Sequence, residues 1–324
     1  MAPRVYDNTR LSTGKSCLRR YYFRHERHWT GEGTSAALAF GAAWHSAMEV
    51  VWPLMCGGSC DVEDMVMQGH KAFLVKWEEL GMNPQLTYEE EADLAPRTPS
   101  RAYEMLAEYV GDERLRHIGD MELLTVERPF IVPLGDYSDG RTVYYVGKID
   151  KVVRRRGKIL GIEHKTTTAY SKAAGFRSAF LDSFNPNSQI DGYLFVLHLT
   201  FPGEVGGVWV DAALVHKQET AFQYIPVEKQ LDMLDAWLFE TRYWVDMIEQ
   251  EKAKLALVSP EDKYMTAFPR NTNDCFNFNV SCPYLDCCRA WPNPVGMPMP
   301  PGMKEEVWDP LKEIPGVQEL LDGR

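Results

Sequence analysis

Apolar residues recur at helical spacing through the first third of the chain, and the pattern changes to β-rich segments bounded by turn residues from Met121 onward. The turn signals include Asp139-Gly140 and Arg156-Gly157, which separate three consecutive strands that we expect to be antiparallel. The predicted helices are 11–23, 36–54, 61–80, 100–117, 186–199 and 228–255, and the predicted strands are 123–132, 142–153, 158–166, 206–216 and 221–227.

Strands flanked by helices predict an α/β fold. The helices between residues about 55 and 120 are expected as a helical insertion into this core. Proline is frequent after Cys288, so we expect residues 291–324 to form an extended tail rather than packed structure. We find no internal repeat.

Composition is that of a packed globular protein. Hydrophobic residues make up 45% and charged residues 25%, which excludes disordered, collagenous and coiled-coil chains. The longest apolar runs fall far short of the roughly 20 residues that cross a bilayer. Residues 1–11 carry Arg4, Asp7 and Arg10 without an apolar core, so we expect no signal or transit peptide, no membrane association and a cytoplasmic location.

The net charge is −11, from 35 Lys and Arg against 46 Asp and Glu, which argues against nucleic-acid binding if the charge is evenly spread. Two short stretches are nevertheless basic. Solvated faces of a helix and a strand are the simpler interpretation, and only the residues around them can decide. The stretches contain Arg19, Arg20, Arg24, His25, Arg27 and His28, and then Lys148, Lys151, Arg154, Arg155, Arg156 and Lys158.

Two motifs carry candidate chemistry, GKID ending at Asp150 and GIEHK ending at Lys165. Side chains alternate along a strand, so Glu163 and Lys165 share one face while His164 points away. If the hairpin brings Asp150 beside Glu163, two carboxylates converge on a site that suits Mg²⁺ or Mn²⁺, with Lys165 placed to hold a water. Such a site hydrolyses phosphodiesters. The alternative is a surface ion pair on an exposed strand.

Other polar residues fit the same site. His45 lies on an Ala-rich helix with Glu49 one turn later, and is a candidate metal ligand. Gln189 and Tyr193 share a helix face and are candidates for contact with a sugar-phosphate backbone. Taken singly, each is also explained as an ordinary core or surface residue.

The seven cysteines favour metal over disulfides, because their number is odd and four of them cluster near the C-terminal end. Four thiolates suit an iron-sulfur cluster or a structural zinc. Cys56 and Cys60 are most simply free thiols. The candidate ligands are Cys17, Cys275, Cys282 and Cys288, with Cys287 a rival for the last position.

In this order the motifs resemble the RecB-like nucleases of the PD-(D/E)XK superfamily, in the 4Fe-4S subgroup that includes the AddB nuclease domain and CRISPR-associated adaptation nucleases. The resemblance implies one nuclease domain over residues 1–290, with a restriction-endonuclease-like central mixed sheet flanked by helices. It also implies an Fe-S clasp that joins Cys17 to residues 275–288 through a 4Fe-4S cluster held by Cys17, Cys275, Cys282 and Cys288.

The same resemblance implies a role for each site residue. His45, Asp150, Glu163 and the His164 carbonyl are implied to bind the divalent metal, and Asp150, Glu163 and Lys165 to be catalytic. Gln189 and Tyr193 are implied to support the site and DNA. Glu127 resembles the acidic residue found on the strand before the Asp motif. The chain departs from the C-x2-C-x5-C ending of the family, since six residues separate Cys275 from Cys282 and five separate Cys282 from Cys288.

The leading hypothesis is therefore a Mg²⁺- or Mn²⁺-dependent DNA nuclease, an exonuclease on single strands or DNA ends in bacterial or phage replication, recombination or repair. One alternative is a nuclease that trims DNA for CRISPR adaptation. Another is a non-catalytic DNA-binding scaffold with a cysteine-bound metal. The sequence has no Walker-type G-x-x-x-x-G-K-[ST] run, so a helicase or recombination partner would be another chain.

Overall fold

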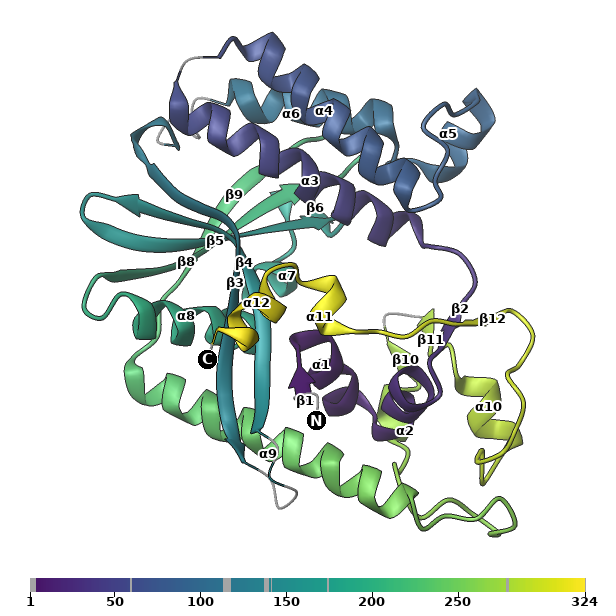
Figure 1. The fold of residues 1–324 in the computed structure, drawn as a ribbon. Helices are drawn as coiled ribbons and strands as arrows, with labels where there is room; N and C mark the ends of the chain where they lie inside the picture. The colour runs from purple at the N-terminus through teal and green to yellow at the C-terminus, as the bar shows by residue number, and fades with distance from the viewer. Residues whose placement is uncertain are drawn as a thin grey trace. The chain divides into compact units, whose positions relative to one another are not determined.

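The structure is a computed structural model that describes residues 4–58, 60–112, 118–136, 140, 142–173, 175–277 and 280–323 (Figure 1). The chain divides into two compact units. The first contains Met1–Glu32, Pro129–Gly147 and Asp235–Arg324, and the second contains Gly33–Arg128 and Lys148–Leu234. Strands β3 (Glu122–Asp136) and β4 (Thr142–Arg155) contribute residues to both units.

A mixed sheet forms the centre of the second unit. Strand β5 (Lys158–Thr167) pairs antiparallel with β4 and parallel with β8 (Val205–Leu214), and β8 pairs antiparallel with β9 (Phe222–Val227). Strand β3 also pairs with β4. The turn at Arg156-Gly157 joins β4 to β5 as the sequence predicted, whereas the predicted turn at Asp139-Gly140 includes residues outside the described part of the chain. The expected mixed sheet is confirmed.

Helices cover this sheet. Helices α3 (Ala36–Gly57), α4 (Val62–Glu79) and α6 (Pro99–Gly111) lie side by side in Figure 1 and share a core with β5 residues Leu160 and Ile162. On the other face, α8 (Ser188–Thr200) approaches closely, since a Cβ on Gly161 would lie 3.0 Å from Cδ1 of Leu197. The α/β fold is confirmed. The unit also contains α5 (Tyr88–Leu94), β6 (Tyr170–Ser171), β7 (Gly175–Phe176) and α7 (Ser178–Asp182).

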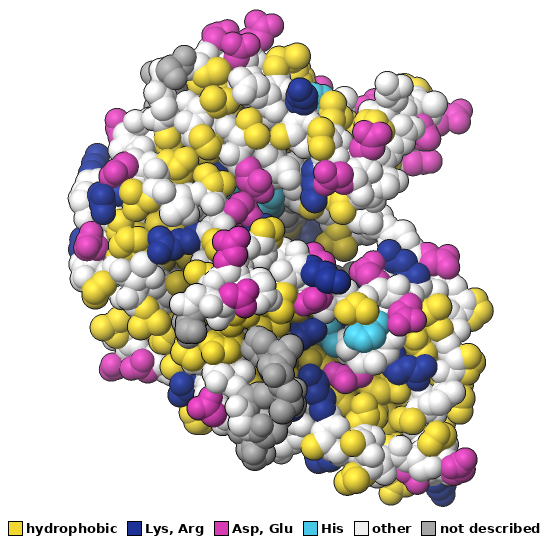
Figure 2. Space-filling model, in the orientation of Figure 1, with side chains coloured by type: hydrophobic (Ala, Val, Ile, Leu, Met, Phe, Trp, Pro, Cys, Tyr) yellow, Lys and Arg dark blue, Asp and Glu magenta, His cyan; other side chains and the backbone are white. Residues whose placement is uncertain are grey.

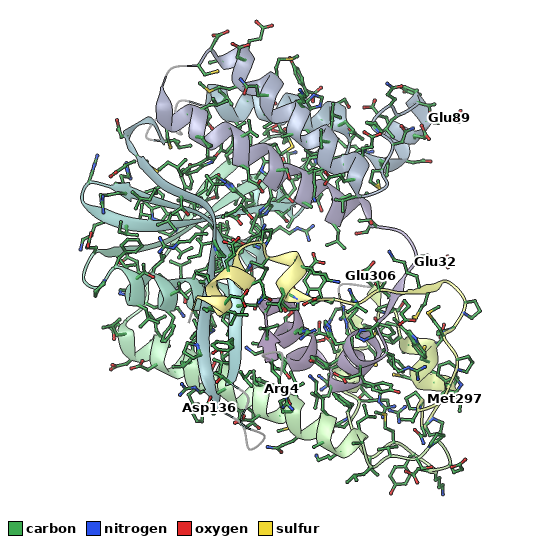
Figure 3. The ribbon with its side chains drawn as sticks, in the orientation of Figure 1. Arg4, Glu32, Glu89, Asp136, Met297 and Glu306 are labelled. Atoms are coloured by element: carbon green, nitrogen blue, oxygen red, sulfur yellow. The ribbon has the colours of Figure 1, made fainter. Side chains whose placement is uncertain are left out.

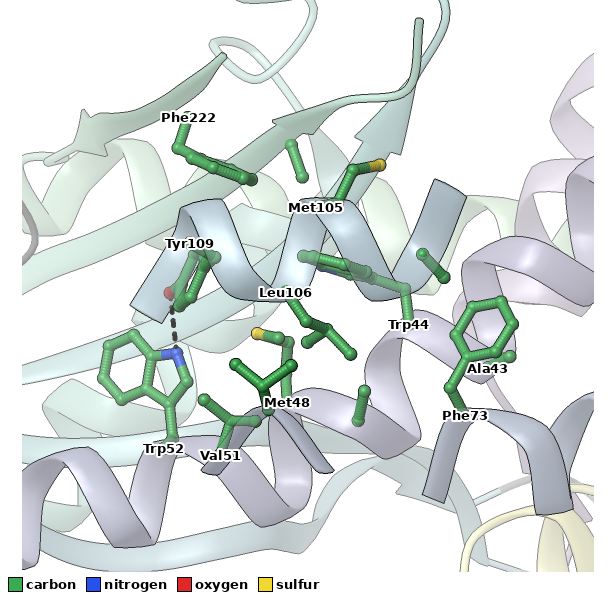
Figure 4. Close-up of a cluster of buried hydrophobic side chains, with 14 of the residues drawn as sticks. Ala43, Trp44, Met48, Val51, Trp52, Phe73, Met105, Leu106, Tyr109 and Phe222 are labelled. Atoms are coloured by element: carbon green, nitrogen blue, oxygen red, sulfur yellow. Dashed lines mark hydrogen bonds between the residues drawn. The ribbon is translucent and has the colours of Figure 1, made fainter. Parts of the chain in front are cut away.

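Large aromatic side chains fill the core under α3 (Figure 4). Nε1 of Trp52 donates a hydrogen bond to the hydroxyl of Tyr109 over 2.9 Å, so the polar atom of each buried ring has a partner. Helices α3 and α4 approach closely at Gly69, where an added Cβ would lie 2.6 Å from Cγ2 of Val51. The segment expected as an insertion, residues 55–120, carries α4, α5 and α6, while residues 113–117 lie outside the described part.

Helix α3, predicted over 36–54, contains Pro53 and does not end there. It continues to Gly57 and ends at Gly58, which has a left-handed conformation with φ 63°. Proline removes one N–H from the helical ladder, and the buried face formed by Val51 and Trp52 outweighs that loss. Among the described residues, no helix has both the length and the apolar character needed to cross a membrane.

The first unit begins with β1 (Arg4–Tyr6), which pairs parallel with β4. The helix predicted over 11–23 is broken at Cys17, whose backbone is extended, into α1 (Asn8–Ser16), α2 (Leu18–Tyr21) and a π-helical turn at Tyr22–Glu26. The unit also contains β2 (Trp29–Gly31), most of α9 (Leu231–Leu255), the 3-10 turn Thr272–Asp274, β10 (Phe276–Asn277), β11 (Val280–Ser281), α10 (Leu285–Ala290), β12 (Met303–Glu305), α11 (Pro310–Glu313) and α12 (Val317–Asp322).

The proline-rich segment 291–324 differs from the extended tail that its composition suggested. Strand β12 pairs antiparallel with β2, and the segment also forms α11 and α12. Ile314 and Val317 are buried against Val5 and Val146, all within the first unit. Burial of these apolar residues stabilises the packed segment, and the frequency of proline does not reveal it.

Candidate active site

The residues predicted for the active site come together within the second unit. Asp150 is on β4, Glu163 and Lys165 are on β5, and His45 is on α3. The register pairs Lys151 with Ile162, which places Asp150 next to Glu163 across the two strands. Both carboxylates are buried, with 5% of Asp150 and 1% of Glu163 exposed. A surface ion pair is therefore excluded for this motif.

Asp150 is held by two neighbours. Its Oδ2 accepts a hydrogen bond from the backbone N–H of His164 over 2.9 Å and lies 3.1 Å from Nδ1 of His45. Burial alone would raise the pKa of Asp150, but the charges of His45, His164 and Lys151 and the hydrogen bond from His45 hold it well below its usual range. Burial acts to lower the pKa of His45, and Asp150 outweighs this and raises it.

Glu163 has one oxygen without a partner. One carboxylate oxygen pairs with Nζ of Lys165, whereas Oε2 is buried and has no hydrogen-bond partner among the described residues. Burial, followed by the charge of Asp150, raises the pKa of Glu163. An unpartnered carboxylate oxygen beside a second carboxylate and an imidazole is a donor set that fits a hard divalent cation. In the described part of the chain, no group of three or more His, Cys, Asp or Glu is arranged as a ready-made metal site.

Lys165 is oriented by helix α8. Its Nζ pairs with Glu163 and lies 3.2 Å from Oε1 of Gln189, and Nε2 of Gln189 donates to the hydroxyl of Tyr193 over 2.8 Å. Burial opposes the charge of Lys165, but Glu163 and Asp150 raise its pKa above the ordinary value. Tyr193 is buried, so its hydroxyl holds the Gln189 amide in the orientation that contacts Lys165.

The His164 side chain points to the opposite face of β5, as alternation predicted, and meets residues that the sequence analysis missed. Nζ of Lys151 lies 2.7 Å from Nε2 of His164, and Nδ1 of His164 lies 3.0 Å from Oδ2 of Asp211. Burial lowers the pKa of Lys151, and burial together with Lys151 lowers that of His164 to about 4. Lys151 is two residues before the core residue Val153 and shares its face of β4, but its own charge concealed its burial in the sequence.

Glu127, proposed from the resemblance alone, lies on β3 and pairs with Lys148. Its φ of 50° is unusual for a residue other than glycine. Burial raises the pKa of Glu127, while Lys148 opposes that effect and Asp150 and Glu49 add to it. The charges of Asp150, Glu49 and Glu127 therefore act on one another.

The basic stretch 148–158 is largely used inside the fold rather than forming an open cationic surface. Lys148 pairs with Glu127 and Lys151 is fully buried. Nη1 of Arg154 lies 3.1 Å from Oε2 of Glu122, and the Arg155 guanidinium lies over the ring of Trp209.

Arginines of the stretch 19–28 likewise bond to other parts of the chain. Arg19 donates to the carbonyl of Phe268, Arg24 to Glu306, and Arg27 to the carbonyl of Met297; Glu306 and Met297 are labelled in Figure 3. On the face drawn in Figure 2, Lys and Arg are spread among acidic and apolar side chains.

The predicted iron-sulfur ligands all belong to the first unit and influence one another electrostatically, but in the described residues no three of them are arranged to hold a metal ion. The Asn271 N–H donates to Sγ of Cys17 over 3.3 Å, and the Cys282 N–H donates to the carbonyl of Cys275 over 2.9 Å. Burial raises the pKa of the Cys288 thiol to about 11; Cys17 and Cys282 add to this, and Arg19 and Arg270 oppose it.

Cys282 is influenced by both Cys17 and Cys275. Burial raises its pKa, and the charges of Cys17 and Cys275 add to the effect. Cys287 is buried, and burial raises its pKa, with Asp286 and Cys282 adding to it. The charge of Cys17 therefore acts on Cys288.

Comparison with known proteins identifies a family. A family model described as the PD-(D/E)XK nuclease superfamily matches residues 8–289. Among solved structures, the chain is similar to a "putative exonuclease" from Eubacterium rectale, with 16% identity, a TM-score of 0.46 and 86% of each chain covered. It is also similar to the protein SSO0001, with 15% identity, a TM-score of 0.21, and 50% of this chain and 77% of that chain covered. No curated protein matches the sequence.

Proposed function

The chain belongs to the PD-(D/E)XK nuclease superfamily, and from this premise we propose that it is a Mg²⁺- or Mn²⁺-dependent nuclease that hydrolyses DNA, acting as an exonuclease on single strands or DNA ends. The observation that carries the proposal is the buried pair Asp150 and Glu163, with Oε2 of Glu163 unpartnered and Lys165 beside it. Buried, unpartnered carboxylate oxygens are expensive in a core and are typical of functional sites.

Asp150, Glu163, His45 and the carbonyl of His164 are the residues proposed to hold the cation. A divalent cation bound there supplies positive charge against the phosphoryl oxygens and lowers the pKa of water. The chain's own groups prepare this site before binding. The His164 N–H fixes one oxygen of Asp150, and the interior position of Glu163 excludes water from its carboxylate.

Lys165 is proposed as the catalytic cation. Its raised pKa keeps it protonated, so it acts as a hydrogen-bond donor and positive charge toward the attacking water and the phosphate. Gln189 accepts from its Nζ and is itself held by Tyr193. These two residues therefore set the direction of the lysine, and DNA contact by them is secondary in this proposal.

A structural 4Fe-4S cluster on Cys17, Cys275, Cys282 and Cys288 is also part of the proposal. The mutual electrostatic influence of these thiols supports it, as does the break of the first helix at Cys17. The guanidinium groups of Arg19 and Arg270 act on Cys288 and would offset the negative charge of bound thiolates. Cys288 is favoured over Cys287 as the last ligand.

The proposed setting is bacterial or phage DNA replication, recombination or repair, with any helicase or recombination partner supplied by another chain. Free thiols and an oxygen-sensitive cluster suit a reducing compartment, so the proposed location is the cytoplasm.

The proposal is tested with protein purified without oxygen and incubated with linear single- and double-stranded DNA labelled at either end, and with closed circular DNA. We expect Mg²⁺ or Mn²⁺ to support release of label from linear DNA, circles to stay intact, and a chelator to stop the reaction. The Asp150→Asn protein, prepared identically, controls for contaminating nucleases. DNA binding without cleavage would support the scaffold alternative, and cut circles would identify an endonuclease.

A further inference from the structure

A fully buried lysine lies directly behind the candidate active site. Lys151 is 0% exposed, as are His164, Tyr109 and Trp52, and Asp211 is 2% exposed. Removing an ammonium from water is expensive unless it is paired and hydrogen-bonded, and an apolar side chain would serve the core at lower cost. Lys151 is therefore a candidate for a role beyond packing.

The chemistry of the lysine determines which nitrogen of His164 carries the proton. An ammonium has only donors, so Nε2 of His164 accepts from Lys151 over 2.7 Å. That leaves the imidazole proton on Nδ1, the nitrogen that lies 3.0 Å from Oδ2 of Asp211. Asp211 also accepts from the hydroxyl of Tyr109 over 2.6 Å, and Tyr109 in turn accepts from Nε1 of Trp52.

These contacts connect three neighbouring strands next to the site residues. Lys151 follows Asp150 on β4, His164 stands between Glu163 and Lys165 on β5, and the parallel register pairs His164 with Asp211 on β8. On the site face, the His164 N–H donates to Asp150. The His164 residue is thus held by its side chain on one face of the sheet and bonds Asp150 through its backbone on the other.

We propose that Lys151, the His164 side chain and Asp211 are positioning residues that fix the His164 peptide and the Asp150 carboxylate in the arrangement required for a divalent cation. The inference rests on the proposed function of this site and adds residues that do not touch the cation. Packing alone is non-directional, whereas the hydrogen bond from Lys151 and the close contact with Asp211 hold the His164 ring from both nitrogens. The backbone N–H of the same residue bonds Asp150, so the orientation of the ring and the position of the Asp150 carboxylate are coupled. Partners one step behind metal ligands commonly change metal affinity on the order of 10- to 100-fold.

The test compares Lys151→Met with Val153→Ala. Both positions are fully buried on β4 and face the same side of the sheet, but Val153 lies outside the polar chain. The measurements are the melting temperature, the Mn²⁺ dissociation constant by electron paramagnetic resonance, and the His164 tautomer by ¹⁵N nuclear magnetic resonance of metal-free protein. We expect the cavity left by Val153→Ala to lower the melting temperature. Only Lys151→Met should weaken Mn²⁺ binding, on the order of 10-fold or more. The parent should carry its His164 proton on Nδ1.

Asp211→Asn gives a second route if Lys151→Met does not fold, because it keeps the shape of Asp211 and removes its charge. Mn²⁺ affinity within about twofold of the parent in the folded variants, or an equal loss in Val153→Ala, would overturn the inference, as would a parent His164 protonated on Nε2. The proposed function fails separately: a parent that binds Mn²⁺ but does not cleave DNA overturns the nuclease proposal alone. A parent that cleaves, with metal affinity unchanged in Lys151→Met, overturns only the positioning role.

Discussion

Nδ1 of His45 lies 3.1 Å from Oδ2 of Asp150, which joins helix α3 to strand β4 at the candidate active site. Asp150 raises the pKa of His45 despite the opposing effect of burial, so the metal-free protein holds a proton on this imidazole over a wider pH range than usual. A metal ligand must be neutral imidazole, so a cation bound by His45 competes with that proton.

Mn²⁺ binding should therefore become weaker as the pH falls through the raised pKa of His45, which lies above the ordinary value of about 6.5. Binding in this range should release protons. Calorimetry in two buffers with different ionisation enthalpies measures the release, and His45→Ala should reduce both affinity and proton release. Identical proton release by the parent and His45→Ala would remove His45 from the ligand set.

The variants Asp150→Asn and Glu163→Gln should stop DNA hydrolysis while keeping the fold. Each replaces a carboxylate proposed to bind the cation by a neutral amide of nearly the same shape. We expect a loss of at least about 10³-fold, comparable to the removal of a major electrostatic group from other active sites. Initial rates on end-labelled DNA with Mg²⁺ and Mn²⁺, together with circular dichroism, measure these outcomes.

Glu79→Gln provides the matched control, since Glu79 is an exposed carboxylate that pairs with Lys76 on α4. It should cleave at the parent rate. Retained Mg²⁺-dependent cleavage in either Asp150→Asn or Glu163→Gln would contradict the metal-site assignment.

Lys165→Ala should bind metal and DNA but lose most of its turnover, on the order of 10²- to 10³-fold, because the proposed metal ligands remain while the protonated donor is removed. Lys165→Arg should recover only part of the rate, since a planar guanidinium does not replace a compact ammonium. Single-turnover rates and DNA binding in Ca²⁺ separate the two effects. Lys76→Ala removes a half-buried surface lysine and should change neither. A parent rate in Lys165→Ala would show that Lys165 takes no part in catalysis.

Residues with clear periodicity were predictable from the sequence. Strand β5 was predicted over 158–166 and spans Lys158–Thr167, and its alternation correctly placed Glu163 and Lys165 together and His164 opposite. Local pattern alone specifies these features, because one register slip would move the whole set to the other face.

Features set by distant residues were not predictable. The extended backbone at Cys17 breaks a locally helical sequence, and its sulfur accepts from Asn271, far along the chain. Lys151 was counted in a basic stretch because its partner His164 belongs to another strand. Charge along a sequence does not show which cations the fold buries or pairs.

His25 should make the protein sensitive to acid. It is buried, neither ring nitrogen has a hydrogen-bond partner among the described residues, and burial lowers its pKa to about 2, with Arg10 and Arg24 adding to the effect. The unfolded chain binds a proton below about pH 6.5 and the folded chain does not, so stability falls as the pH decreases below that value. The contribution is up to about 1.4 kcal/mol per pH unit.

His25→Phe keeps an aromatic ring beside Tyr21, 4.7 Å away, and removes the titrating group. Urea unfolding between pH 7 and pH 5 should show a smaller loss of unfolding free energy in the variant than in the parent. Equal slopes would mean that His25 is protonated in the folded protein, contrary to its lowered pKa.

The four proposed cluster ligands, Cys17, Cys275, Cys282 and Cys288, should bind iron, and the bound cluster should stabilise the fold. A metal bridging Cys17 and Cys288 closes a very long loop, so it restrains the unfolded chain and adds ligand bonds that the unfolded state lacks. Replacing Cys17, Cys282 or Cys288 with Ala should lower yield and melting temperature and bleach the brown colour of protein prepared without oxygen, and Cys275→Ala should do the same. Cys287→Ala is the adjacent control, and it should keep the colour because Cys288, on which the charge of Cys17 acts, is the proposed last ligand. Cys56→Ala should also keep it. Absorbance, metal analysis and calorimetry measure these effects, and stoichiometric zinc without iron would refute the cluster while leaving the nuclease proposal intact.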